Sequence, residues 1–99
     1  MTAAPSLVHA LDFSAVKAVI EAHGRYLGGQ RGGKRANLTY VDLSNMALDG
    51  LDLSDADLTG ARLAGTSLNG ARLKRTIMFG CDLREADLRA TDLTQADLR

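Results

Sequence analysis

A five-residue unit repeats along the chain from Ala36 to Arg99 and constrains the fold more than any other feature of the sequence. It fills thirteen consecutive pentads, the last of them one residue short. The third position is Leu in every pentad except one, where Met78 stands. The first position is small or apolar throughout, and the other three positions carry the charge.

A period of five fits neither an α-helix, whose apolar stripe recurs every 3.6 residues, nor a plain strand, whose side chains alternate. It fits a chain that runs extended for a few residues and then turns a corner, so that each pentad forms one side of a coil. The first and third positions are two residues apart and therefore point to the same, inward side. Each unit buries its apolar side only by stacking on its neighbours.

Units such as Ala56-Asp57-Leu58-Thr59-Gly60 follow the pattern Ala-(Asp/Asn)-Leu-x-x. In this pattern the chain closely resembles the pentapeptide-repeat family over nearly two thirds of its length. The resemblance implies a mainly β fold, a right-handed quadrilateral β-helix with four pentads per coil. About three coils are expected, with a length of about 15 Å. The expected domains are an N-terminal helical cap with a Gly-rich basic connector, residues 1–35, and the β-helix, residues 36–99.

Apolar side chains at helical spacing predict an amphipathic helix before the repeat: Phe13, Val16, Val19, Ile20, His23 and Leu27. Asp12 or Ser14 can accept hydrogen bonds from the free amides at its start, and Gly28 can take the left-handed conformation that ends it. A short helical turn is also expected at residues 6–11. The apolar stripe needs a partner, so we expect an α-helical cap over the first coil. The run from His23 to Leu38 is also similar to leader segments of some bacterial members of the family.

The fifth position forms the corner of each side. Gly in this position suits the positive φ of the third residue of a type II turn. Larger residues resist that conformation, so we expect type I-like turns at five other corners: Tyr40, Arg75, Glu85, Ala90 and Gln95. A coil of 20 residues also stacks residue n on residue n+20, which places Asp42, Arg62 and Asp82 in one file and Asp52, Arg72 and Asp92 in another.

Composition excludes several classes of function. The formal net charge is zero, so nothing draws the whole chain to nucleic acid or to a membrane surface. A single Cys excludes an internal disulfide, and no Cys/His cluster indicates a metal site. No signal-peptide pattern and no apolar run of about 20 residues is present, which favours a soluble cytoplasmic protein. The many Asp residues recur with the repeat and form no catalytic constellation, so neither an enzyme nor a cofactor is expected.

One pentad, residues 76–80, breaks the pattern with large apolar residues in outward positions. Ile77 and Phe79 there could contact a protein partner, together with the nearby basic residues Lys74, Arg75 and Arg84. Scattered surface apolar residues are also normal. The favoured function is a non-catalytic interaction module with an unknown protein partner.

The connector, residues 28–35, has Gly and Lys at the spacing of a phosphate-binding loop. Its context contradicts that function, because a helix precedes the loop, a coil follows it and no Ser or Thr comes after the Lys. A flexible hinge is expected instead. The alternative is a small anion site made by Arg31, Lys34 and Arg35, which with Arg25 could bind nucleic acid weakly.

The resemblance implies another function, since some family members mimic DNA and inhibit or protect DNA gyrase. Such mimicry needs a long acidic rod, whereas this repeat carries ten acidic and seven basic residues over about three coils.

The repeat runs to Arg99 without a capping pattern. Solenoids normally need a polar cap for solubility, so we expect a homodimer through the last coil or a continuation in a longer repeat protein. The expected contact residues are Leu83, Leu88, Leu93 and Leu98.

Overall fold

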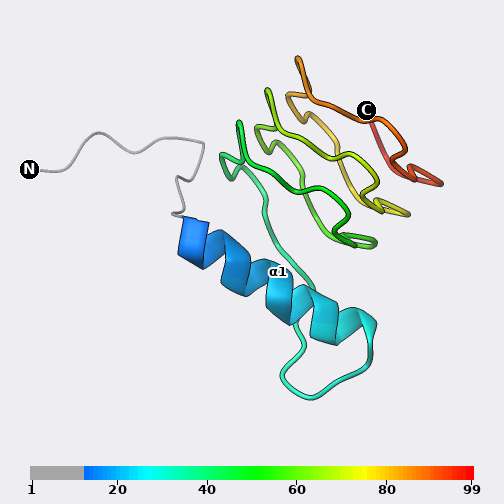
Figure 1. Ribbon diagram of the computed structural model, residues 1–99. Coiled ribbons are helices and arrows are strands. Elements are labelled where there is room, and N and C mark those ends of the chain that lie inside the picture. The colour runs from blue at the N-terminus through cyan, green and yellow to red at the C-terminus, as the bar shows by residue number, and fades with distance from the viewer. Residues whose placement is uncertain (1–12) are drawn as a thin grey trace, which may run out of the picture.

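The computed structural model describes residues 13–99, which form one helix followed by a stack of coils (Figure 1). Helix α1 spans Phe13–Leu27, and the coils begin at Ala36. The helix has the range that its apolar spacing predicts. The helical turn expected at residues 6–11 and the expected cap at Asp12 lie outside the described residues.

Helix α1 ends in a left-handed glycine, but one residue later than expected. Gly29, not Gly28, has the positive φ of 67°. The Gly29 N–H donates to the Tyr26 carbonyl at 3.1 Å, and the Gln30 N–H donates to the Arg25 carbonyl at 2.8 Å. This pair of bonds is the Schellman arrangement, which needs the residue after the helix cap to be left-handed. Gly28 instead continues the helical bonding by donating to the Gly24 carbonyl.

The coil repeats every 20 residues, as the pentads predict. Nine parallel β-bridges join second-position residues to the residues 20 further on, from Asn37 with Asp57 to Ile77 with Asp97. Among residues 13–99 these bridges are isolated, and no continuous strand forms. Each side of the coil is extended for about three residues between turns, so only its middle residue is flanked by bonds on both sides.

All corners have the same turn, and the expectation of type I-like turns at five of them was wrong. Tyr40, Arg75, Glu85, Ala90 and Gln95 all have positive φ, between 56° and 60°. At each corner the next first-position N–H donates to the third-position carbonyl, as Val41 does to Leu38. A different turn would shift the bridges of every later side, so the register overrides a local cost of about 1–2 kcal/mol per left-handed non-glycine residue.

The core is a column of third-position side chains with small first-position residues beside it. Leu53, Leu58, Leu63 and Met78 are among its fully buried members. Polar groups in the first position are satisfied inside the stack. Thr66 Oγ1 donates to the Leu43 carbonyl at 2.7 Å, one coil below, and Thr76 and Thr91 make the equivalent bonds.

Helix α1 lies against the first coil, where Val16 is fully buried and Val19 and Ile20 pack on the core. Buried His23 joins the two. Its Nδ1 accepts the Ala36 N–H at 2.9 Å, and its Nε2 donates to the Ser54 carbonyl at 2.8 Å. In later coils each first-position N–H donates to a carbonyl of the turn before it. Each fourth-position carbonyl accepts an N–H of the coil before it, as the Phe79 carbonyl accepts the Gly60 N–H. His23 therefore supplies a partner for two of the backbone groups that the first coil would otherwise leave unpaired, the Ala36 N–H and the Ser54 carbonyl.

Candidate interaction surfaces

Phe79 and Ile77 both contribute to the surface of the coil. Phe79 is 51% exposed at a fourth position, and Ile77 is half-buried at a second position, bridged to Asp57 and Asp97. The Arg99 guanidinium lies 5.6 Å from the centre of the Phe79 ring. That cation–π contact covers one part of the ring and leaves an apolar surface beside it.

Sequence reasoning missed a second exposed aromatic on the same side of the coil. Tyr40 is 47% exposed, and its ring packs over Gly60, where any side chain would collide with it. Residues 36–40 lie two coils below residues 76–80, so the 20-residue register places Tyr40 in the corner file of Gly80, next to the file that holds Phe79. That register was the signal that could have found Tyr40.

The three basic residues expected beside Phe79 are all paired with carboxylates. Arg75 donates through Nε and Nη2 to Asp55 at 2.8 and 3.0 Å, and Lys74 Nζ lies 3.8 Å from Asp92. Arg84 makes a two-point contact with Asp82 and belongs to the next side of the coil. These guanidinium bonds raise the pKa of Arg75 and Arg84. None of these three basic residues is therefore free to form a basic cluster beside the apolar surface.

The second-position carboxylates are used in the fold itself. An Asp or Asn side-chain oxygen accepts the N–H two residues on, as in Asp42 with Ser44 and Asp57 with Thr59. Asp82 and Asp87 each accept this N–H and also the guanidinium of the residue that donates it. Hydrogen bonds from Arg84 and Arg89 lower the pKa of these two carboxyls from 3.8 to about 2. They remain charged acceptors at neutral pH.

Cys81 lies in an inward first position and is partly buried. Its Sγ is 2.9 Å from the Leu58 carbonyl, in the same arrangement as the Thr hydroxyls. Burial raises the pKa of the thiol to about 11, so it stays a neutral donor rather than a thiolate nucleophile. Within residues 13–99 no group of three or more His, Cys, Asp or Glu side chains could hold a metal ion. Over the same range, no helix has the length and apolar character needed to cross a bilayer.

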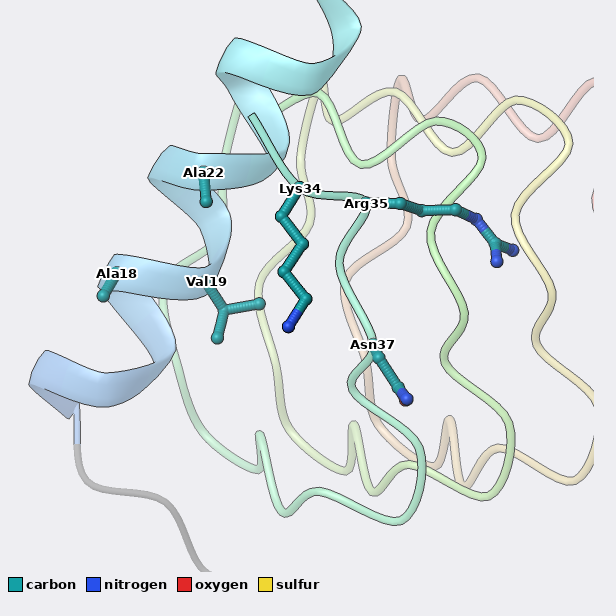
Figure 2. A pocket seen from close by; sticks show the side chains of 6 residues that line it. All are labelled: Ala18, Val19, Ala22, Lys34, Arg35 and Asn37. Atoms are coloured by element: carbon teal, nitrogen blue, oxygen red, sulfur yellow. The ribbon is translucent and has the colours of Figure 1, made fainter. Parts of the chain in front are cut away.

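The basic residues of the connector do not meet at one point. Arg31 is exposed, and Arg35 Nε donates to the Asp55 carbonyl at 2.5 Å. Arg25 Nε donates to the Gly32 carbonyl at 3.4 Å. Figure 2 shows Lys34 pointing into the space beside α1 and Arg35 pointing away from it. The connector is fixed on α1 at Gly33, where a Cβ would collide with the backbone of Tyr26.

The leucines of the last coil are less buried than those of the earlier coils. Leu83, Leu88 and Leu93 are half-buried and pack on the core, and Leu98 is 51% exposed. The backbone N–H groups of Leu83, Leu88 and Leu93 have no backbone partner among residues 13–99.

Comparison with known proteins identifies the repeat. The family model described as pentapeptide repeats matches eight copies, over residues 36–75 and 67–99. No curated protein sequence matches significantly.

Solved structures of pentapeptide repeat proteins have the same fold. One, Rfr23 from the cyanobacterium Cyanothece 51142, has 34% identity and a TM-score of 0.61 over 64% of this chain and 44% of its own. Another, from the Arabidopsis thaliana thylakoid lumen, has 36% identity and a TM-score of 0.55 over 56% of this chain and 38% of its own. QnrB1, a plasmid-mediated fluoroquinolone resistance protein, has 29% identity and a TM-score of 0.59 over 63% of this chain and 29% of its own.

This chain thus spans less than half the length of these solved proteins. Its matching residues include every coil described above. The chain belongs to the pentapeptide-repeat family, whose members form β-helices.

Proposed function

We propose that this chain is a non-catalytic interaction module that presents one side of its coil to a protein partner. The observation that carries the proposal is the 51% exposure of Phe79 beside Ile77. The other second- and fourth-position residues of this side are polar: Asn37, Thr39, Asp57, Thr59, Asp97 and Arg99. Aromatic residues are enriched in the cores of protein interfaces, where a partner removes them from water. Tyr40 extends the same surface at the corner.

Affinity capture from native lysate tests this surface when matched variants are compared. The double variant Ile77→Thr/Phe79→Ser should fold normally, because both side chains lie outside the leucine column, and should lose the partner. Tyr26→Ser is the control, since Tyr26 is an exposed aromatic on α1. A protein retained by the wild type and Tyr26→Ser but lost by the double variant supports the proposal. Equal retention by all three contradicts it.

We further infer that the coil is the right-handed quadrilateral β-helix implied by the family resemblance, with α1 as its N-terminal cap. The 20-residue bridge spacing and a closed turn every five residues support four sides per coil. We also propose that the protein acts in the cytoplasm, since a free Cys81 without a disulfide partner suits a reducing compartment. Fractionation of native cells tests the location.

We propose that two copies of the chain associate through the exposed side of the last coil. The contact residues are Leu83, Leu88, Leu93 and Leu98. The alternative proposal is that further coils of a longer protein cover these residues. The exposed Leu98 and the unpaired N–H groups of the last coil support a contact there. Light scattering after size-exclusion chromatography measures the oligomeric state of this chain and tests the proposed self-association. A dimer that becomes a monomer in Leu93→Lys supports the contact, and a stable wild-type monomer contradicts it.

Modulation of DNA gyrase is the second candidate function, favoured by the similarity to the fluoroquinolone resistance protein QnrB1. Mimicry of DNA requires a row of free carboxylates. In this chain Asp55, Asp82 and Asp87 are paired with arginines, so we rank the function below protein interaction. A supercoiling assay with purified gyrase tests it, and unchanged supercoiling at saturating protein rules it out.

A further inference from the structure

A narrow groove separates α1 from the chain that enters the first coil. It has a volume of about 240 Å³ and is lined by Ala18, Val19 and Ala22 of α1 and by Lys34, Arg35 and Asn37 (Figure 2). The helix side is apolar, and among residues 13–99 no acidic side chain lines the groove. This volume is below the range of about 300–1,000 Å³ for sites that enclose drug-sized molecules, so the groove can hold only a short stretch of a ligand.

The backbone of Asn37 offers an unused donor and acceptor beside this groove. One coil later, Asp57 shows where such groups point: its N–H donates to the Ala36 carbonyl at 3.1 Å, and its carbonyl accepts the Leu38 N–H at 2.8 Å. Both bonds reach the preceding coil. Asn37 has the same position with no coil before it, so its N–H and carbonyl face the side where α1 lies. Neither has a backbone partner within residues 13–99.

Lys34 supplies a positive charge to the groove. Its backbone N–H donates to the Ala22 carbonyl at 3.0 Å, which holds this residue against α1. Figure 2 shows its side chain extending between Val19 and Asn37. In the described part of the chain no carboxylate lies within ion-pair distance of its ammonium group.

We propose that this groove binds an extended acidic peptide of a partner protein, which adds one rung to the N-terminal face of the coil. The carbonyl of one peptide residue accepts the Asn37 N–H, and the N–H of the peptide residue two positions later donates to the Asn37 carbonyl, as Ala36 and Leu38 do for Asp57. A Glu or Asp side chain of the peptide pairs with Lys34, and a small apolar side chain packs on Val19. Strand addition to an open edge is a common mode of peptide recognition. The proposal does not depend on the Phe79 surface.

Fluorescence anisotropy with three labelled peptides tests both parts of the contact. The first probe is Gly-Gly-Glu-Ala-Val-Ala-Gly-Gly with blocked ends, the second replaces Glu by Gln, and the third carries N-methyl groups on Ala, Val and Ala. We expect the Gln probe to bind the wild type about tenfold more weakly than the Glu probe, because a charged hydrogen bond is lost. The N-methylated probe should bind at least about tenfold more weakly, because it cannot donate to the Asn37 carbonyl.

Variants of the protein locate the site. Lys34→Gln should weaken the Glu probe about tenfold and leave the Gln probe unchanged. Lys17→Gln is the matched control, because Lys17 is also on the first-coil side of the molecule but lines a different groove, with Ile20 and Leu51. It should leave all three affinities unchanged.

Three results overturn the proposal. Equal binding of the normal and N-methylated probes means that no rung forms. Displacement of the Glu probe by excess inorganic phosphate, with no effect of N-methylation, indicates a simple anion site. A tenfold gain in affinity on deletion of residues 2–12 indicates that the chain's own N-terminal segment fills the groove.

Discussion

The first and last coils of the stack bury the same leucine positions to different extents. Leu38 and Leu43 in the first coil are fully buried, whereas Leu83 and Leu88 in the last are half-buried. The first coil lies between the second coil and α1, and the last coil has a complete neighbour on one side only. A single coil is too thin to shield its own leucines, so burial depends on a layer at each side.

The layer that covers the first coil is built differently from the coils. Coils stack through backbone bonds that repeat every five residues, so no single residue carries the contact. Beyond its first turn the helix uses its backbone N–H groups internally, and His23 is the described helix residue that provides two bonds to the coil. The repeated region therefore distributes its stability over equivalent positions, and the helical region concentrates it on residues that occur once.

The largest effect is expected from Leu58→Asp, in the middle of the stack. Leu58 is fully buried, and an unpaired carboxylate there costs several kcal/mol, a large part of a domain's total of about 5–15 kcal/mol. We expect no folded protein by circular dichroism. Leu98→Asp places the same carboxylate at the same repeat position in the last coil, where 51% exposure lets water solvate it. It should change the free energy of unfolding by less than about 1 kcal/mol. A folded, equally stable Leu58→Asp variant would refute the layered core.

His23→Phe should have the next largest effect, since it removes two bonds and leaves the Ala36 N–H and Ser54 carbonyl unpaired. Each unsatisfied buried group costs about 1–3 kcal/mol, so urea unfolding should show a loss of about 2–6 kcal/mol. Tyr26→Phe is the control, because it keeps the ring that stacks on His23 at 5.7 Å. A loss below 1 kcal/mol for His23→Phe would mean that the helix is held by its apolar side chains alone.

Replacement of two glycines of the helical region by Ala should change the stability of the protein in opposite directions. Gly33→Ala places a Cβ against the Tyr26 backbone, which cannot move without shifting α1, and should cost about 1–3 kcal/mol. Gly24→Ala has open space around the new Cβ within the helix and should stabilise it by about 0.5–1 kcal/mol. Thermal unfolding of the two variants measures the difference. The same sign for both would show that the connector is not fixed on the helix.

Substitutions at a corner should change stability by similar amounts at either end of the stack. Gly50 in the first coil and Ala90 in the last share one file, with φ of 70° and 58°. Gly50→Ala meets no neighbouring atom, so only the left-handed strain remains, about 1 kcal/mol of destabilisation. Ala90→Gly should relieve the same strain and stabilise by up to about 1 kcal/mol. Melting temperatures test the pair, and a large effect at only one end would tie the strain to burial.

The smallest effect is a difference in acid sensitivity. The pKa values of Asp82 and Asp87 fall from 3.8 to about 2 on folding, so their contribution is complete above about pH 4 and is lost as the pH falls towards 2. The Asp82→Asn/Asp87→Asn variant keeps the local acceptor oxygen but has no group to titrate. Its stability should therefore decline less steeply than that of the wild type between pH 4 and 2. Parallel declines would show that other carboxyls dominate acid unfolding.

The period of the sequence predicted the coil length, the inward leucines and the files of stacked residues, because these follow from counting along a regular backbone. It also located α1. The corner conformations were mispredicted at residues such as Tyr40 and Ala90, because local φ preference was weighed without the register that neighbouring coils impose. His23 bonds to Ala36 and Ser54, which follow it by 13 and 31 positions in the sequence. These bonds depend on the path of the connector, which no repeat specifies.

The ion pairs of the candidate surface show the same limit. Arg75 with Asp55 follows the 20-residue spacing and could be foreseen, whereas Arg84 with Asp82 depends on side-chain rotamers within one pentad.

The 20-residue coil has a consequence for how such a chain can change its length. Addition or loss of a whole coil leaves every later pentad on its original side, so both interior and surface stay aligned. Addition of one pentad keeps each leucine inside but turns all later residues by one side. Phe79 would then move to the side now occupied by Arg84, with no change in the core. A small insertion can therefore redesign the whole outer surface of this protein while the fold that carries it is inherited unchanged.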